Sequence, residues 1–248
     1  MMATAGLYPP AVHAMANHVT NCLKAHRTRL SAQFTCPPLF VGVQGPQGSG
    51  KTFLTSRLRA LLAGPPYSLS VAVLSIDDLY LPHAGLTALA EAHPQNRLLR
   101  GRGQPGTHDA ALGRAILFGL KAINNGAGEV SLPVFDKSMF DGAGDRAAET
   151  RAVRPPIDVV VLEGWCVGFY PVPRAVVEAR WARAAVSGRG GEEGVGTGGG
   201  FDLHAQATLE DVLEVNTMLR AYVAWWQILD AFVQVRIRCV ALSDAGRR

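Results

Sequence analysis

The stretch that most restricts the fold is a glycine loop between an apolar run and a helical pattern. Gly45–Thr52 reads GPQGSGKT and fits the pattern G-x-x-x-x-G-K-[ST]. It follows PLFVGVQ, which is typical of a buried strand, and it opens KTFLTSRLRALLA, whose leucines recur at helical spacing. Strand, glycine loop and helix in this order predict a phosphate-binding loop.

The residue types in this loop match what a nucleoside triphosphate needs. Glycines let backbone N–H groups turn toward phosphate oxygens, and the helix N-terminus adds a partial positive charge. Lys51 can reach the β and γ phosphates, and Thr52 offers a hydroxyl to Mg²⁺. The predicted phosphate-binding residues are Gly45, Pro46, Gln47, Gly48, Ser49, Gly50, Lys51 and Thr52.

Strand-like and helix-like segments alternate along the chain. The runs SVAVLSI, IDVVVLEG and AFVQV predict three more buried strands, and helical patterns cover residues 12–30, 51–63, 109–124 and 208–229. We therefore expect an α/β fold, a P-loop NTPase three-layer sandwich with a mainly parallel sheet and helices on both faces. The expected organisation is one domain over 1–248, with a leading helix in 1–35, a flexible glycine-rich insertion at 187–200 and an atypical C-terminus at 236–248.

Composition excludes several classes of protein. No run approaches 18 apolar residues, so no membrane partner is expected. The net charge of +4 without a Lys/Arg cluster fits a small anionic ligand and argues against nucleic acid. Scattered cysteines are typical of a reducing compartment, so we expect a cytoplasmic or also nuclear protein. The acid-free stretch before Asp77 keeps an organellar transit segment as an alternative. The oligomeric state stays open.

Carboxylates follow two of the expected strands. Asp77 and Asp78 end SVAVLSIDD, and Glu163 follows DVVVL. Parallel sheets place their ligand crevice at this edge. A carboxylate there can accept a proton from an attacking hydroxyl or hold Mg²⁺ through water. The alternative is a capping or solvated side chain.

Two glycine-broken segments, RLLRGRGQPGTHDA and LPVFDKSMFDGAGDRAAE, are expected to be polar loops over the same edge. Arginine binds carboxylate or phosphate oxygens in pairs, so these loops favour an anionic acceptor. A solvated surface charge is the alternative for each residue. The candidate acceptor contacts are Arg102, His108, Asp109, Asp136, Lys137 and Arg146.

The motifs GPQGSGKT, SIDDLYLPH, GRGQPGTHD, LPVFDKS, GAGDR and VVVLEGWCVGF occur in this order, and together the chain resembles the D-glycerate 3-kinase family. That family is similar in fold to uridine kinase, phosphoribulokinase and pantothenate kinase. The resemblance implies ATP and Mg²⁺ as cofactors and a small hydroxy acid as acceptor, D-glycerate above all. It implies catalytic roles for Lys51, Asp77 as general base and Glu163, Mg²⁺ contacts for Thr52 and Glu163, and acceptor contacts for Asp78 and Tyr80.

The chain departs from this family at its end. Relatives continue into a helix with arginines that covers the nucleotide, and RIRCVALSDAGRR does not resemble that helix. One alternative function is therefore a nucleotide-binding protein without turnover. Another is a kinase for a nucleoside or a pantothenate-like alcohol, against which the arginine-bearing loops argue.

Overall fold

A four-stranded parallel sheet forms the centre of the protein. The computed structural model describes residues 8–31, 35–126, 128–189 and 203–236. The strand order is β2-β5-β1-β6, and every neighbouring pair is parallel. The four expected strands and the parallel sheet are thereby confirmed. The strands are β1 (Leu39–Gln44), β2 (Val71–Ser75), β5 (Val159–Gly164) and β6 (Ala231–Gln234).

Alternate side chains of the central strands enter two separate cores. Val41 and Val161 belong to one cluster, whereas Phe40 and Leu162 belong to the other. Every residue of β1 and β5 is buried. Such near-continuous apolar strands arise where both faces of a sheet are covered.

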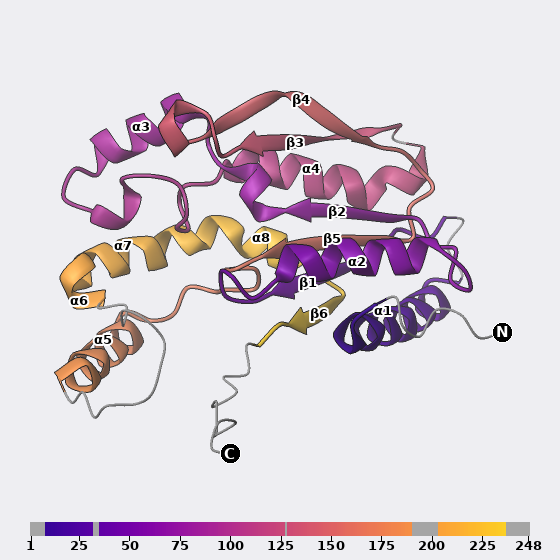
Figure 1. Ribbon diagram of the computed structural model, residues 1–248, viewed down its shortest axis with the longest axis horizontal. Coiled ribbons are helices and arrows are strands. Elements are labelled where there is room, and N and C mark those ends of the chain that lie inside the picture. The colour runs from indigo at the N-terminus through magenta and orange to yellow at the C-terminus, as the bar shows by residue number, and fades with distance from the viewer. Residues whose placement is uncertain (1–7, 32–34, 127, 190–202, 237–248) are drawn as a thin grey trace, which may run out of the picture.

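Helices cover the two faces of this sheet (Figure 1). On one face lie α1 (Pro10–Arg29) and α2 (Lys51–Ala63), which contribute to the core around Val41. The other face is covered by α4 (Ala110–Ala122) and α8 (Val223–Trp226). Trp225 and Trp226 of α8 are buried in the core on this face. The expected three layers are therefore present, and α1 is the helix expected within residues 1–35.

One of the two expected polar loops is instead a β-hairpin. Strands β3 (Val130–Asp136) and β4 (Asp145–Val153) pair antiparallel and form a separate two-stranded sheet. Leu132 of β3 is buried in the core beside α4, while most of β4 is exposed. The polar composition of this segment reflects that exposed strand, which is why it resembled a loop. The hairpin tip between the strands lies over the site described below.

The long helix expected over 208–229 is interrupted. It consists of α7 (Leu209–Met218), the 3₁₀ turn η5 (Leu219–Tyr222) and α8. Residues 219–226 contain neither glycine nor proline, so the interruption has no local sequence signal. The turn η5 coincides with the buried contacts of Tyr222, and such 3₁₀ stretches are frequent where tertiary contacts tighten a helix end.

The remaining elements surround the carboxyl edge of the sheet or connect the helices. Helix α5 (Arg174–Arg189) includes residues 187–189 of the expected glycine-rich insertion. The rest of that insertion, like residues 237–248, lies outside the described residues. Among the described residues, no helix combines the length and apolarity needed to span a bilayer. The remaining elements that surround the carboxyl edge or connect the helices are η1 (Ile76–Leu79), α3 (His83–Ala92), η2 (Arg97–Leu99), η3 (Ile123–Asn125), η4 (Phe140–Gly142), α5 (Arg174–Arg189) and α6 (Leu203–Gln206).

Candidate active site

The loop between β1 and α2 has a backbone suited to phosphate. Gly48 and Gly50 have φ angles of 74° and 78°, a left-handed conformation that favours glycine. A Cβ on Gly45 would lie 2.9 Å from the Val235 carbonyl oxygen, so this position needs glycine for close approach. The buried Ser49 hydroxyl has no partner among the described residues. A bound phosphate oxygen would satisfy that hydroxyl, so the loop fits the ligand expected for it.

Lys51 begins α2 and lies over the loop. Its Nζ donates to the Pro46 carbonyl oxygen at 2.9 Å and makes no carboxylate ion pair within the described part of the chain. The charge of Lys51 is thus held by the loop itself, beside the backbone that would cradle a phosphate.

Thr52 and Glu163 form the second polar pair at this edge. The Thr52 hydroxyl donates to Glu163 Oε1 at 3.1 Å, and Glu163 is the penultimate residue of β5, level with Val43 of β1 and Ser75 of β2. Burial raises the pKa of Glu163 above its ordinary value, opposed by hydrogen bonds from Ser75 and Thr52 and by the Lys51 charge. A hydroxyl and a carboxylate are the oxygen donors that Mg²⁺ prefers, so this pair fits the expected ion. The described residues contain no cluster of three or more His, Cys, Asp or Glu side chains that would hold a metal unaided.

Asp77 lies in η1, directly after β2, and both of its carboxylate oxygens have partners. Tyr80 donates from its hydroxyl to Oδ1 at 3.2 Å, and Lys137 donates from Nζ to Oδ2 at 2.6 Å. Lys137 directly follows β3, so the hairpin places a cationic side chain beside the Asp77 carboxylate in η1. The predicted base, its tyrosine and the predicted acceptor lysine therefore lie together.

Asp78 faces the opposite way from its neighbour. Its Oδ1 accepts from the backbone N–H of Phe135 at 3.3 Å, and its Oδ2 pairs with Arg151 at 3.0 Å. Burial raises the pKa of Asp78, opposed by these two partners. Asp78 thus joins η1 to the hairpin, and its expected contact with the acceptor stays a prediction.

Arg102 braces the hairpin tip from the other side. Its Nη1 donates to the carbonyl oxygens of Gly142 and Ala143, and the guanidinium lies 5.9 Å from the centre of the Phe135 ring. Gly144 allows this packing, because a Cβ there would meet the Phe135 ring at 2.4 Å. The remaining guanidinium nitrogens of Arg102 have no hydrogen bond within the described residues.

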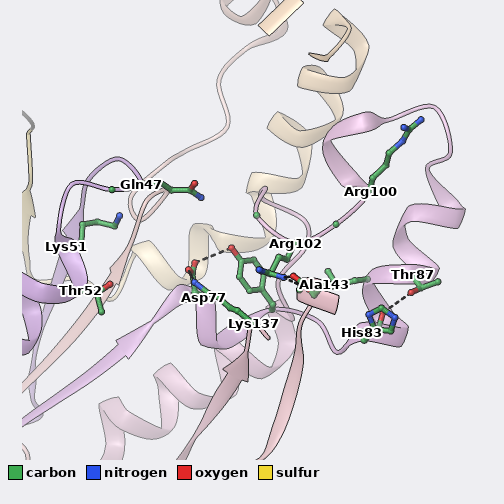
Figure 2. Close-up of a pocket in the computed structure, with 16 residues that line it drawn as sticks. Gln47, Lys51, Thr52, Asp77, His83, Thr87, Arg100, Arg102, Lys137 and Ala143 are labelled. Carbon is green, nitrogen blue, oxygen red and sulfur yellow. Dashed lines mark hydrogen bonds and ion pairs between the residues drawn. The ribbon is translucent and has the colours of Figure 1, made fainter. Parts of the chain in front are cut away.

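Many of the side chains described above line a single cavity of about 690 Å³. Figure 2 shows Lys51 and Thr52 at one end, His83 at the other, and Asp77 and Lys137 between them. Its lining comes from the phosphate loop, η1, α3, the segment 100–103 and the hairpin tip: Gln47, Gly48, Lys51, Thr52, Asp77, Tyr80, His83, Leu86, Thr87, Arg100, Gly101, Arg102, Gly103, Lys137, Gly142 and Ala143.

Besides Asp78, four further predicted acceptor contacts do not line this cavity. His108 is 4% exposed, and its Nδ1 contacts the Tyr222 hydroxyl at 2.7 Å. Asp136 accepts from the backbone and hydroxyl of Ser138, which lowers its pKa. Both residues therefore have partners within the protein, and the acceptor contacts expected for them stay predictions.

Asp109 and Arg146 form the other pair outside the cavity. Asp109 caps α4 by accepting from the Leu112 N–H at 2.9 Å, and Arg146 pairs with Asp109 at 3.2 Å. Arg146 also donates to the Tyr80 carbonyl oxygen at 3.0 Å. The pair ties β4 to the segment that carries the base, and the acceptor contacts expected for both residues stay predictions.

Sequence reasoning missed the far wall of the cavity. His83 and Thr87 come from α3, a short helix that was not predicted, and His83 stacks on Phe140 of the hairpin tip at 3.9 Å between ring centroids. Gly142 and Ala143 contribute from the tip itself. The available signal was the glycine-rich GAGDR, since positive φ angles at Gly142 and Gly144 mark a tight turn.

The fold and the phosphate loop together are of the P-loop kinase type. Phosphoryl transfer needs a phosphate loop, an acidic residue beside it and a second carboxylate; here these are residues 45–52, Glu163 near the end of β5, and Asp77, which lines the cavity.

Comparisons with known proteins agree with this class. No profile of a protein family matches the chain. A solved structure of D-glycerate 3-kinase from Cryptococcus neoformans var. grubii serotype A superposes with a TM-score of 0.81 at 37% identity, covering 92% of this chain and 73% of that one. The chain belongs to the D-glycerate 3-kinase family, as its motifs indicated.

Two curated relatives support the assignment. The chloroplastic D-glycerate 3-kinase of Arabidopsis thaliana is 31% identical over 217 residues, which are 86% of this chain and 41% of the relative. The probable ATP-dependent kinase TDA10 of Saccharomyces cerevisiae is 39% identical over 142 residues, 56% of this chain and 49% of the relative. The matches thus span about half the length of these curated relatives.

Proposed function

We propose that this protein transfers the γ-phosphoryl group of ATP to a hydroxyl of a small hydroxy acid, with D-glycerate as the first candidate. One observation carries the proposal. The phosphate loop and the Asp77 carboxylate, with Arg102 and Lys137 beside it, line the same cavity of about 690 Å³. Donor and acceptor can therefore meet in one space, which is the main requirement for phosphoryl transfer.

The phosphate end of the cavity binds and orients the nucleotide. Backbone N–H groups around Gly48 and Gly50, with Lys51 above them, surround the position of the β and γ phosphates. Thr52 and Glu163 would hold Mg²⁺ directly or through water, and the bound ion would offset the charge of the phosphates.

Asp77 receives the proton of the reaction. As the acceptor hydroxyl oxygen bonds to the γ-phosphorus, ADP leaves and the hydroxyl proton passes to the Asp77 carboxylate. Each carboxylate oxygen can accept two hydrogen bonds, so Asp77 retains Tyr80 while it binds the acceptor.

The acceptor end favours an acid over a nucleoside. Lys137 and the unpaired nitrogens of Arg102 provide a cationic wall for a carboxylate. The two rings in the lining are already stacked, Tyr80 on His108 and His83 on Phe140. A nucleoside base stacks on an exposed aromatic face, and Tyr80, at 2% exposed, offers none.

The test is an ADP-release assay on purified protein with MgATP. D-Glycerate is compared with glycerol, which lacks only the carboxylate function, and with uridine and pantothenate. Asp77→Asn keeps the shape of the base but not its basicity, and the exposed Asp141→Asn on the hairpin tip is the matched control. Lys51→Ala reports on the phosphate end.

We expect D-glycerate to be phosphorylated far faster than glycerol. Asp77→Asn should lose about 10²- to 10⁴-fold in rate, as removal of a general base does. Lys51→Ala should abolish turnover, and Asp141→Asn should retain it. Bound ATP with no phosphorylated acceptor would instead support a nucleotide-binding protein without turnover. A preference for uridine or pantothenate would contradict the acid-binding assignment.

A further inference from the structure

Beneath the predicted base lies a chain of buried rings that the phosphoryl transfer itself does not use. Tyr80, whose hydroxyl holds Asp77, stacks on His108 with ring centroids 4.4 Å apart and an interplanar angle of 16°. His108 meets Tyr222 edge to face, with centroids 5.6 Å apart. Tyr222 is 1% exposed and does not line the cavity.

The Tyr222 hydroxyl determines the protonation pattern of His108. It accepts a hydrogen bond from the Gly106 N–H at 2.8 Å and lies 2.7 Å from His108 Nδ1. A hydroxyl has one proton to donate, and Nδ1 is the one acceptor that the described residues offer it. With the hydroxyl donating to Nδ1, the neutral ring carries its own proton on Nε2, which is buried and has no partner among the described residues. Burial lowers the pKa of His108 to about 3, which keeps the ring neutral at physiological pH.

This hydrogen bond fixes the plane on which Tyr80 rests. The backbones are also joined, since Tyr80 and His108 form an isolated antiparallel bridge and Asp109 N–H donates to the Leu79 carbonyl at 2.8 Å. A change in the tilt of His108 would therefore be passed to the Tyr80 ring and to its hydroxyl on Asp77 Oδ1.

We propose that Tyr222 is a positioning residue for the phosphoryl transfer, acting through His108 and Tyr80 on the orientation of Asp77. The inference rests on the proposed function. It adds a residue from the interrupted C-terminal helix to a site otherwise built by the phosphate loop, η1, α3, the segment 100–103 and the hairpin tip.

The first experiment deletes a single oxygen. Tyr222→Phe retains the ring that packs on Trp225 and Trp226 and removes the hydroxyl's bonds to His108 and to the Gly106 N–H. We expect kcat with D-glycerate to fall about tenfold to a hundredfold, the scale of a slightly misplaced catalytic group. The KM for MgATP should not change, because the phosphate loop is untouched. Ile116→Val, a one-methyl deletion in the same core, is the control for lost stability and should leave kcat in place.

A double-mutant cycle separates positioning from a general structural role. Tyr80→Phe removes the hydroxyl that holds Asp77. If Tyr222 acts through Tyr80, then Tyr222→Phe should lower kcat little further in the Tyr80→Phe background. Fold losses that multiply, or a Tyr222→Phe loss no larger than that of Ile116→Val, would overturn the proposal.

Nuclear magnetic resonance tests the chain without turnover. In the wild type, the ¹⁵N shifts of His108 should show a proton on Nε2 and a hydrogen-bonded, unprotonated Nδ1. Tyr222→Phe should change both these shifts and the ¹³C shift of the Asp77 carboxylate. A wild-type proton on Nδ1, or an Asp77 signal unmoved in Tyr222→Phe, would contradict the inference. An inactive wild type with the expected shifts would contradict the proposed function alone.

Discussion

The buried histidine beneath Tyr80 makes the stability of the protein depend on pH in a calculable way. His108 is 4% exposed, and burial lowers its pKa from 6.5 to about 3. Between these two values the unfolded chain binds a proton at this position and the folded chain does not. The contribution of His108 to stability is therefore present above pH 6.5 and is lost as the pH falls toward the folded pKa.

The size of the loss follows from linkage. One pKa unit corresponds to about 1.4 kcal/mol. The pKa of His108 is 6.5 in the unfolded chain and about 3 in the folded protein. Lowering the pH from 7 to 5 should therefore reduce the free energy of unfolding by about 2 kcal/mol. His108→Gln removes the titration while keeping a side-chain oxygen for the Tyr222 hydroxyl.

The assay is urea unfolding at pH 7 and pH 5. We expect the free energy of unfolding of the wild type to fall by about 2 kcal/mol more than that of His108→Gln over this interval. His18→Gln, on the exposed face of α1, is the control and should behave as the wild type. An equal fall in the wild type and His108→Gln would refute the reasoning, since it would mean that His108 is protonated in the folded state.

Two further predictions concern packing and anchoring. Gly113→Ala should lower the free energy of unfolding by about 1–3 kcal/mol, because the new Cβ would lie 2.1 Å from Trp225. Gly119→Ala is the control in the same helix. Its Cβ would lie 3.4 Å from the nearest neighbouring atom, so this variant should be neutral or stabilising by up to about 1 kcal/mol. Thermal or urea unfolding distinguishes the two, and equal effects would contradict the packing. Asp78→Ala removes the acceptor of two hairpin donors, so it should lower the free energy of unfolding by about 1–3 kcal/mol and raise the KM for the acceptor. The control Glu129→Ala breaks an exposed ion pair and should change the free energy of unfolding by no more than about 0.5 kcal/mol. An unchanged acceptor KM in Asp78→Ala would argue against the anchoring role.

The phosphate loop could be predicted from sequence because its determinants are local. Strand, glycine turn and helix each have a short-range pattern, and Gly48 and Gly50 occupy the positions that require left-handed backbone. The parallel sheet followed from the same alternation of apolar strands and helices. These parts of the fold needed no knowledge of distant contacts.

The acceptor side could not be predicted in the same way. Strand β4 is mostly exposed and charged, and its partner β3 lies across a glycine-rich tip, so its pairing left little periodic signal. Asp77 and Asp78 are adjacent and chemically identical, yet one faces the cavity and the other anchors the hairpin. His108 carries polar atoms typical of a site but is buried beneath it. Only tertiary contacts distinguish such residues.

The position of β1 in the sheet has a consequence for how the protein folds. Its two neighbours are β5 and β6, so Val41 pairs with Val161 on one side and with Ala231 on the other. The first residue of the phosphate loop is also backed by Val235, whose N–H donates to the Gln44 carbonyl oxygen at 2.7 Å. Contacts between segments so distant in sequence form slowly, because a long loop must close before they are made. On the ribosome, the phosphate loop at residues 45–52 therefore gains its support at Gly45 only after β6 and Val235 have emerged.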